Sequence, residues 1–188
     1  MTQILGISGS LRKHSYNSAL LRAAQEMFPD LIERGEIGEI PLYNGDVEQR
    51  GVPESVLALK QRLIEADGLL LVSPEYNNSM PGVLKNVIDW LSRPSLDVRN
   101  AFHGKPVALI GASPGGFGTI LAQNAWLPVF RTLRVNYWSA GRLMISGASN
   151  VFDDQGALVD SDIEHRLDQF LTGFVDFCEN AAKRDSDG

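Results

Sequence analysis

An unbroken apolar run leads directly into a polar loop and then into an amphipathic helix near the middle of the chain. The run Gly68-Leu-Leu-Leu-Val72 has the pattern of a strand that is buried on both faces. After the polar loop, apolar residues recur at the spacing of one helix face: Val83, Leu84, Val87, Ile88 and Leu91. Strands buried on both faces belong to parallel sheets that are covered by helices. This stretch therefore predicts an α/β fold.

The same alternation of apolar strands and amphipathic helices extends along the chain. We expect strands at residues 3–8, within 31–40, at 68–72, at 106–111 and within 137–145. Helices are expected at residues 18–28, 53–66, 83–91, 119–134 and 160–183, with loops at 41–51 and 94–105 and a frayed tail at 185–188. The pattern predicts one domain over residues 1–188. Its fold is expected to be a flavodoxin-like three-layer α/β/α sandwich with a five-stranded parallel sheet of order 2-1-3-4-5.

Length and composition narrow the class of protein. The chain of 188 residues is long enough for one domain with a substantial core, and its net charge of -6 argues against nucleic acid or an anionic membrane as the main partner. No apolar run approaches the roughly 20 residues of a transmembrane helix. The single cysteine, Cys178, excludes an internal disulfide and is expected to be packed in the core. With no signal-peptide pattern, these features predict a cytoplasmic protein.

The loop after the first predicted strand, Gly9-Ser-Leu-Arg-Lys-His-Ser-Tyr-Asn17, has the chemistry of an anion site. Backbone N–H groups at the start of the following helix favour an anion. Ser10, Ser15 and Asn17 add neutral donors, and the Arg12 guanidinium suits phosphate oxygens. This set matches a terminal phosphomonoester. The alternative is that Ser15 or Asn17 only caps the helix and that Arg12 is solvated.

Two more unusual loops follow the third and fourth predicted strands. The segment Glu75-Tyr-Asn-Asn-Ser79 is more polar and aromatic than a simple turn requires, and Gly111-Ala-Ser-Pro-Gly-Gly-Phe-Gly118 lets the backbone approach a ligand closely. In an open α/β sheet, ligands bind at the carboxyl ends of the strands. The three loops are therefore expected to form one site.

Two of these segments resemble the motifs of the NAD(P)H-dependent FMN reductases, a flavodoxin-like family that includes quinone, azo-dye and chromate reductases. The similar segments are Gly9-Ser-Leu-Arg-Lys-x-Ser-x-Asn17 and Pro74-Glu-Tyr-Asn-x-Ser-x-Pro-Gly-x-Leu-Lys-Asn-x-Ile-Asp-Trp90. A looser similarity continues through Gly111-Ala-Ser-Pro-Gly115 and Ala122-Gln123. The chain departs from many relatives at Leu121, where they carry arginine, and at Pro128, which should interrupt one hydrogen bond of the fourth long helix.

The resemblance implies how the three loops would hold FMN. The first loop would bind the FMN phosphate through Ser10, Arg12, Ser15 and Asn17. The second would lie along the flavin ring through Pro74, Glu75, Tyr76 and Asn77, with the backbone of Glu75 at the flavin and its side chain facing outward. The third would close the edge of the ring through Ser113, Gly115 and Gly116.

The resemblance also implies the activity. NADPH or NADH would pass a hydride to FMN and leave, and a small acceptor would then take the electrons in a ping-pong reaction. Quinones, free flavins, azo compounds and oxidised metals such as chromate are the expected acceptors. Because the flavin carries the chemistry, we expect no catalytic acid or base and no metal ion; His14, His103 and His165 lack metal-ligand spacing.

Two other functions fit parts of the sequence. A non-enzymatic electron carrier or signalling flavoprotein would share the fold and the acidic charge. A hydrolase could pair an early serine with Asp162 and His165, but position 10 is serine where the Gly-x-Ser-x-Gly elbow requires glycine.

The helices that contain Trp90 and Trp126 are rich in large apolar side chains, including Leu127 and Phe130. Some of these are expected to form the interface of a homodimer or homotetramer.

Overall fold

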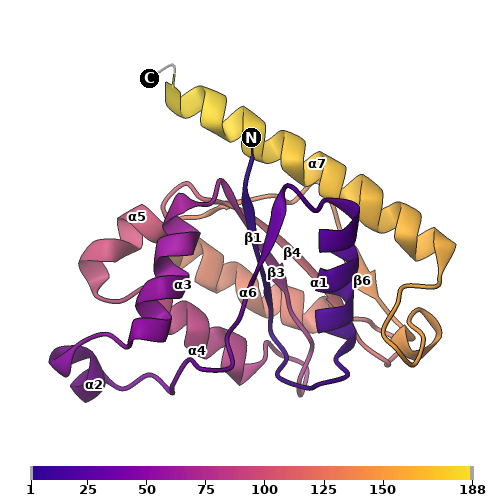
Figure 1. The fold of residues 1–188 in the computed structure, drawn as a ribbon, viewed down its shortest axis with the longest axis horizontal. Coiled ribbons are helices and arrows are strands. Elements are labelled where there is room, and N and C mark those ends of the chain that lie inside the picture. The colour runs from indigo at the N-terminus through magenta and orange to yellow at the C-terminus, as the bar shows by residue number, and fades with distance from the viewer. Residues whose placement is uncertain (1, 187–188) are drawn as a thin grey trace.

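The computed structural model describes residues 2–186 and contains a parallel sheet between two layers of helices (Figure 1). The strands are β1 (Ile4–Ser8), β2 (Ile32–Gly35), β3 (Gly68–Val72), β4 (Pro106–Ala112), β5 (Asn136–Tyr137) and β6 (Leu143–Ile145). Their order is β2-β1-β3-β4-β5, with β6 also paired to β4, and these strands pair in parallel. The predicted fold class and strand order are confirmed.

Seven α-helices and two short 3-10 helices connect the strands in the described part of the chain. The α-helices are α1 (Tyr16–Met27), α2 (Gly45–Arg50), α3 (Glu54–Glu65), α4 (Gly82–Leu91), α5 (Val98–Phe102), α6 (Ile120–Leu133) and α7 (Ser161–Ser186). The 3-10 helices are η1 (Ser95–Asp97) and η2 (Ala148–Asn150). None of the described helices has both the length and the apolar character needed to cross a membrane.

The apolar core lies on both faces of the sheet. Because successive strand residues face opposite sides, Leu70 and Val72 pack with α1 and α7, whereas Leu69 and Leu71 pack with α3 to α6. Close approach requires glycine at one of these contacts. A Cβ built on Gly68 would lie 2.6 Å from the Cys178 sulfur of α7. The helix layers therefore hold the strand ends, and with them the loops, in a fixed arrangement.

Four details differ from the sequence prediction. The expected loop at 41–51 contains α2, which Asn44 caps and which buries no residue, and the expected connection at 94–105 contains η1 and α5. The fifth strand is divided into β5 and β6, which both pair with β4. α7 continues through Ser186, so the frayed tail expected from residue 185 does not begin there; residues 187–188 lie outside the described part.

The carboxyl ends of the long strands lie at one edge of the sheet, which is at the bottom of Figure 1. The loops that follow β1, β3 and β4 leave the sheet at this edge. The predicted juxtaposition of the three unusual loops follows from the strand order, because β1, β3 and β4 are adjacent.

Candidate functional site

The first and second of these loops contact each other where they leave the sheet. The backbone N–H of Gly9 donates to the carbonyl of Val72 at 2.8 Å. A Cβ at position 9 would lie 2.9 Å from the Leu84 side chain and 3.0 Å from Pro74, so a larger residue would push the two loops apart. Glycine at position 9 thus keeps the start of the first loop beside Pro74, the start of the second loop.

The first loop ends at the open start of α1. The Ser15 hydroxyl caps the helix by accepting a 3.3 Å hydrogen bond from the N–H of Ser18, and the first turn of α1 contains no acidic residue. The Arg12 side chain is exposed and forms no ion pair with any residue that the structure describes. Ser15 is therefore a helix cap, and its own hydroxyl hydrogen is left to donate to an anion.

Asn17 has a structural role that the sequence did not indicate. Its side chain is buried, its amide nitrogen donates to the carbonyl of Ala112 at 2.8 Å, and its amide oxygen accepts from the N–H of Ala112 at 2.9 Å. These two bonds tie the first turn of α1 to the last residue of β4. Only the second hydrogen of the side-chain amide is left for a phosphate oxygen.

The second loop forms a tight hairpin turn. The N–H and carbonyl of Tyr76 pair with the carbonyl and N–H of Ser79 at 3.0 and 3.1 Å, and Asn77 and Asn78 have positive φ angles of 50° and 60°. Asparagine tolerates this left-handed backbone better than other non-glycine residues, and two such residues in succession form a type I′ turn. The turn presents the half-exposed Tyr76 ring, whose hydroxyl lies 3.4 Å from the Ser10 hydroxyl of the first loop.

The expectation that the Glu75 side chain faces outward is wrong. Its carboxylate accepts hydrogen bonds from the backbone N–H groups of Leu121 and Ala122 at 2.8 and 2.9 Å. These donors belong to the first turn of α6, where the helix dipole favours a negative charge. Glu75 therefore joins the second loop to the helix that follows the glycine-rich loop.

The glycine-rich loop presents open backbone. The hydroxyl of Ser113 accepts from the N–H of Gly115 at 3.2 Å, Gly115 and Gly116 are exposed, and nothing lies within 4 Å of a Cβ built on Gly116. Phe117 next to them is 84% exposed. At the base of the loop, a Cβ on Gly111 would lie 2.2 Å from the carbonyl oxygen of Ser73, so only glycine lets these two segments meet.

Two groups of buried hydrogen bonds support the second and third loops, and no periodic pattern in the sequence indicates them. The Trp126 indole N–H donates to the Ser73 hydroxyl at 3.0 Å, and this hydroxyl donates to the carbonyl of Pro74 at 3.1 Å. The buried Gln123 amide donates to the Thr119 hydroxyl at 3.2 Å and to the carbonyl of Leu143 at 3.1 Å. Only the polar residue types at strand and helix ends could have indicated these pairs.

The two tryptophans are core residues, so they are not among the side chains of these helices that could form an interface between subunits. Trp90 and Trp126 have no exposed surface, Phe130 is 5% exposed, and the Trp90 indole donates to the carbonyl of Pro41 at 2.8 Å. Of the four large residues, some of which were expected at an interface, only Leu127 is exposed, at 43%. The residues that could meet a partner on α6 are Ile120, Leu121 and Leu127.

The described residues give little support to a metal site, a serine hydrolase or a cysteine nucleophile. No group of His, Cys, Asp and Glu among residues 2–186 could hold a metal ion. The His165 ring lies beside the Gln169 amide on the exposed face of α7 and has no contact with Ser10. Burial raises the pKa of Cys178 to about 12, so its thiol is unsuited to nucleophilic chemistry near neutral pH.

The arrangement can take a planar ligand that carries a phosphate. The open start of α1, the hydroxyls of Ser10 and Ser15, and Arg12 suit the phosphate. The half-exposed Tyr76 ring and the bare backbone at Gly116 suit contact with a flat ring. The residues present therefore fit FMN.

Comparison with known proteins gives consistent results. The family described as NADPH-dependent FMN reductase matches residues 2–150. An NAD(P)H-dependent FMN reductase of Pseudomonas aeruginosa is 46% identical over 171 residues, which cover 90% of this chain and 91% of that protein. A quinone reductase of Pseudomonas putida is 38% identical over 94% of each chain. Among solved structures, the flavoenzyme NAD(P)H:(acceptor) oxidoreductase FerB of Paracoccus denitrificans superposes with a TM-score of 0.86 at 34% identity, covering 96% of this chain and 99% of that one.

Proposed function

The chain belongs to the NADPH-dependent FMN reductase family, and from this premise we propose that it passes electrons from NADPH or NADH, through FMN, to a quinone. The observation that carries the proposal is the contact between the Tyr76 and Ser10 hydroxyls. It joins the loop suited to a flavin ring with the loop suited to its phosphate into one continuous surface.

The residues that would hold FMN are those expected from the sequence. Ser10, Arg12, Ser15 and the free amide hydrogen of Asn17 would bind the phosphate oxygens, and Arg12 supplies the charge-assisted bonds. Pro74, Glu75, Tyr76 and Asn77 would lie along the ring, with Ser113, Gly115 and Gly116 at its edge. When bound, FMN accepts a hydride from the nicotinamide and gives electrons to the acceptor.

The chain's own contribution is position and electrostatics. Among the proposed ring-facing residues only Glu75 and Tyr76 carry an acidic group, and the Glu75 carboxylate is already engaged with α6. We therefore assign no acid or base to the reaction. The backbone N–H of the exposed Gly116 is suited to stabilise negative charge that develops on the ring, because that of Gly115 already donates to the Ser113 hydroxyl.

A quinone suits the apolar groups that border this surface. Tyr76 and Phe117 are 44% and 84% exposed, on two loops that flank the place proposed for the flavin. Exposed rings of this kind can stack on a flat aromatic acceptor. Because nicotinamide and quinone would use the same open side, we propose that they bind in turn, as a ping-pong reaction requires.

The same proposal extends to assembly and location. The exposed apolar residues of α6 and Phe117 favour a homo-oligomer, which we expect to detect by light scattering at micromolar concentration. Free flavin, azo compounds and chromate are further acceptors to include in a panel. The single cysteine, buried as a thiol, suits a cytoplasmic enzyme.

Anaerobic stopped-flow absorbance tests the function. The FMN-loaded protein is expected to lose its yellow colour within seconds of mixing with NADPH or NADH, and to regain it when benzoquinone is added. Steady-state rates at several quinone concentrations should give the parallel reciprocal plots of a ping-pong reaction. A flavin that dithionite bleaches but neither nicotinamide does would instead indicate an electron carrier.

A further inference from the structure

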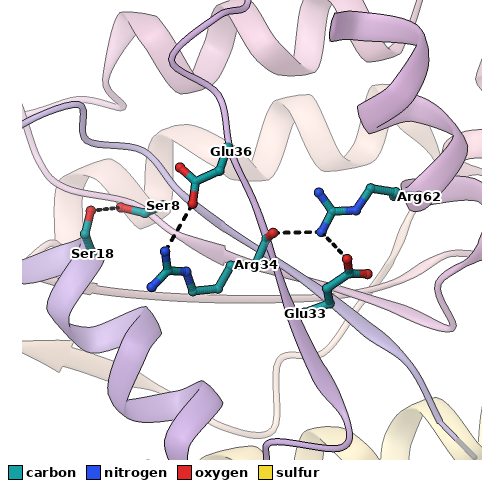
Figure 2. Close-up of polar contacts among 6 residues, drawn as sticks. All are labelled: Ser8, Ser18, Glu33, Arg34, Glu36 and Arg62. Atoms are coloured by element: carbon teal, nitrogen blue, oxygen red, sulfur yellow. Dashed lines mark hydrogen bonds and ion pairs between the residues drawn. The ribbon is translucent and has the colours of Figure 1, made fainter.

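A cavity lies beside the first loop, on the face of the sheet covered by α1, and its lining includes Ser10 and Arg12 of the proposed phosphate site. It has a volume of about 280 Å³ and is bounded by the first loop, one side of α1 and the segment after β2. The hydroxyls of Ser8 and Ser18, which line it, are hydrogen-bonded to each other at 3.0 Å (Figure 2). The proposed binding of FMN uses neither of these two hydroxyls.

The lining of this cavity is strongly cationic. It includes Arg12, Lys13, Arg22 and Arg34 but only one carboxylate, that of Glu36. The whole chain has 17 basic and 23 acidic residues, so this concentration of positive charge runs against the overall balance. Arg12 alone suffices for the flavin phosphate proposed above. Lys13, Arg22 and Arg34 take no part in that binding, and Arg22 and Arg34 each use one N–H group in a contact within the chain, with the carbonyl of Gly156 and with Glu36.

The edge strand β2 directs one of these cations into the cavity. Glu33 and Arg34 point to opposite sides of the strand, and Figure 2 shows the Arg34 guanidinium on the side of Ser8 and Ser18. On the other side, Arg62 binds the Glu33 carboxylate at 2.8 Å and the carbonyl of Arg34 at 2.7 Å, which fixes the strand. The Arg34 guanidinium forms a 3.1 Å pair with Glu36, and its side chain is 36% exposed. One N–H group is used in that pair, and the remaining donors can reach a ligand.

Given the proposed use of NAD(P)H, we propose that this cavity binds the 2′-phosphate of NADPH and that Arg34 selects NADPH over NADH. The place fits the chemistry, because the cavity brings Lys13, Arg22 and Arg34 together beside the first loop, and an arginine fork suits the oxygens of a phosphate. The cavity adjoins the first loop, so a nucleotide held there extends towards the ring-facing loops. Because the Ser8 and Ser18 hydroxyls are bonded to each other, one of their two hydrogens is left to donate to the phosphate.

Binding to the FMN-loaded protein tests this assignment without turnover. Isothermal titration calorimetry compares adenosine 2′,5′-bisphosphate with 5′-AMP, which differ only in the 2′-phosphate. The wild type is expected to bind the bisphosphate more tightly. Arg34→Gln should weaken bisphosphate binding about tenfold or more, leave 5′-AMP unchanged, and lower the NADPH to NADH ratio of kcat/KM by a similar factor. Arg34→Lys should retain part of the preference because it keeps the charge.

The matched control is Arg131→Gln, which removes the same charge from the exposed surface of α6 on the other face of the sheet. It should leave the preference intact, and thermal melting should show that all three variants fold. Equal binding of the two nucleotides by the wild type, or an unchanged preference in Arg34→Gln, would overturn the assignment. Weaker FMN binding in Arg34→Gln would overturn it too, because the cavity would then belong to the flavin phosphate. A wild type that prefers the bisphosphate but oxidises neither nicotinamide would refute the proposed function and still support the cavity's role.

Discussion

The indole N–H of Trp126 donates a 3.0 Å hydrogen bond to the hydroxyl of Ser73, and both side chains are fully buried. The bond connects α6 with Ser73, the first residue after β3, where the second loop begins. Ser73→Ala would leave a buried indole donor without an acceptor. We expect the free energy of unfolding in urea to fall by about 1–3 kcal/mol.

A double-mutant cycle separates this bond from the other effects of each change. Trp126→Phe removes the donor, so adding Ser73→Ala to it should cost less than Ser73→Ala does in the wild type. Strictly additive losses would show that the hydrogen bond contributes nothing.

The Glu75 carboxylate should stabilise α6 as well as the second loop. Glu75→Ala removes the acceptor for two N–H groups at the helix start, and we expect a loss of about 1–2 kcal/mol in urea unfolding. Glu75→Gln keeps an acceptor oxygen without the charge and should lose less. If the two variants are as stable as the wild type, the carboxylate does not cap α6 in solution.

Asn17 should matter even when no flavin is bound. Asn17→Ala would leave the N–H and carbonyl of Ala112 without their partners inside the protein, at a cost of about 2 kcal/mol or more. The measurement is urea unfolding of the flavin-free protein. A variant that binds FMN weakly but unfolds like the wild type would contradict the structural role.

Arg12 should act on the flavin phosphate and not on the ring. Arg12→Ala is expected to raise the dissociation constant of FMN about 10- to 100-fold and to leave that of riboflavin, which lacks the phosphate, nearly unchanged. Fluorescence quenching of each flavin gives both constants. Arg50→Ala, on the exposed helix α2, is the control of equal charge. A similar loss for the two flavins would rule out the phosphate assignment.

The thiol of Cys178 should remain protonated and unreactive near neutral pH until the protein unfolds. Burial raises its pKa from an ordinary value of 9.0 to about 12. Between these two pH values the folded chain keeps a proton that the unfolded chain releases, so stability should fall as pH rises through this window and be unaffected below it. The wild type should therefore lose stability relative to Cys178→Ala between pH 9 and 11. At pH 8, reaction with a thiol reagent should follow the rate of unfolding; a fast reaction of the folded protein would show that the thiol is accessible.

The sequence predicted the parts of the fold that depend on long apolar patterns. β3 matches its predicted range because a strand buried on both faces leaves an unbroken apolar run. α2 was missed because it buries no residue and has no apolar period; only Asn44 marks its start. The division of the fifth strand was missed because β5 has only two residues, both half-buried.

The site was predictable as a set of loops but not as a set of contacts. Glu75 and Leu121 are 46 residues apart, so their hydrogen bond depends on how α6 is placed and has no local signal. Apolar helix residues likewise do not reveal which neighbour covers them. Trp90 is enclosed by Tyr43, which packs edge-on at 5.0 Å, and Trp126 is stacked on Phe130 at 5.8 Å. Both tryptophans are thus covered within one chain.

The division of the fifth strand also determines how copies of this chain can associate. An edge strand with free backbone groups invites another chain to extend the sheet, and short or charged edges prevent this. One edge here consists of the two-residue β5 and the three-residue β6, and the other is β2, which carries Glu33 and Arg34. Neither edge offers a long apolar ladder to a neighbour. The association proposed above would therefore use side chains such as Leu127 on α6 and not strand pairing, and these short or charged edges protect the protein from the strand-to-strand growth that leads to aggregation.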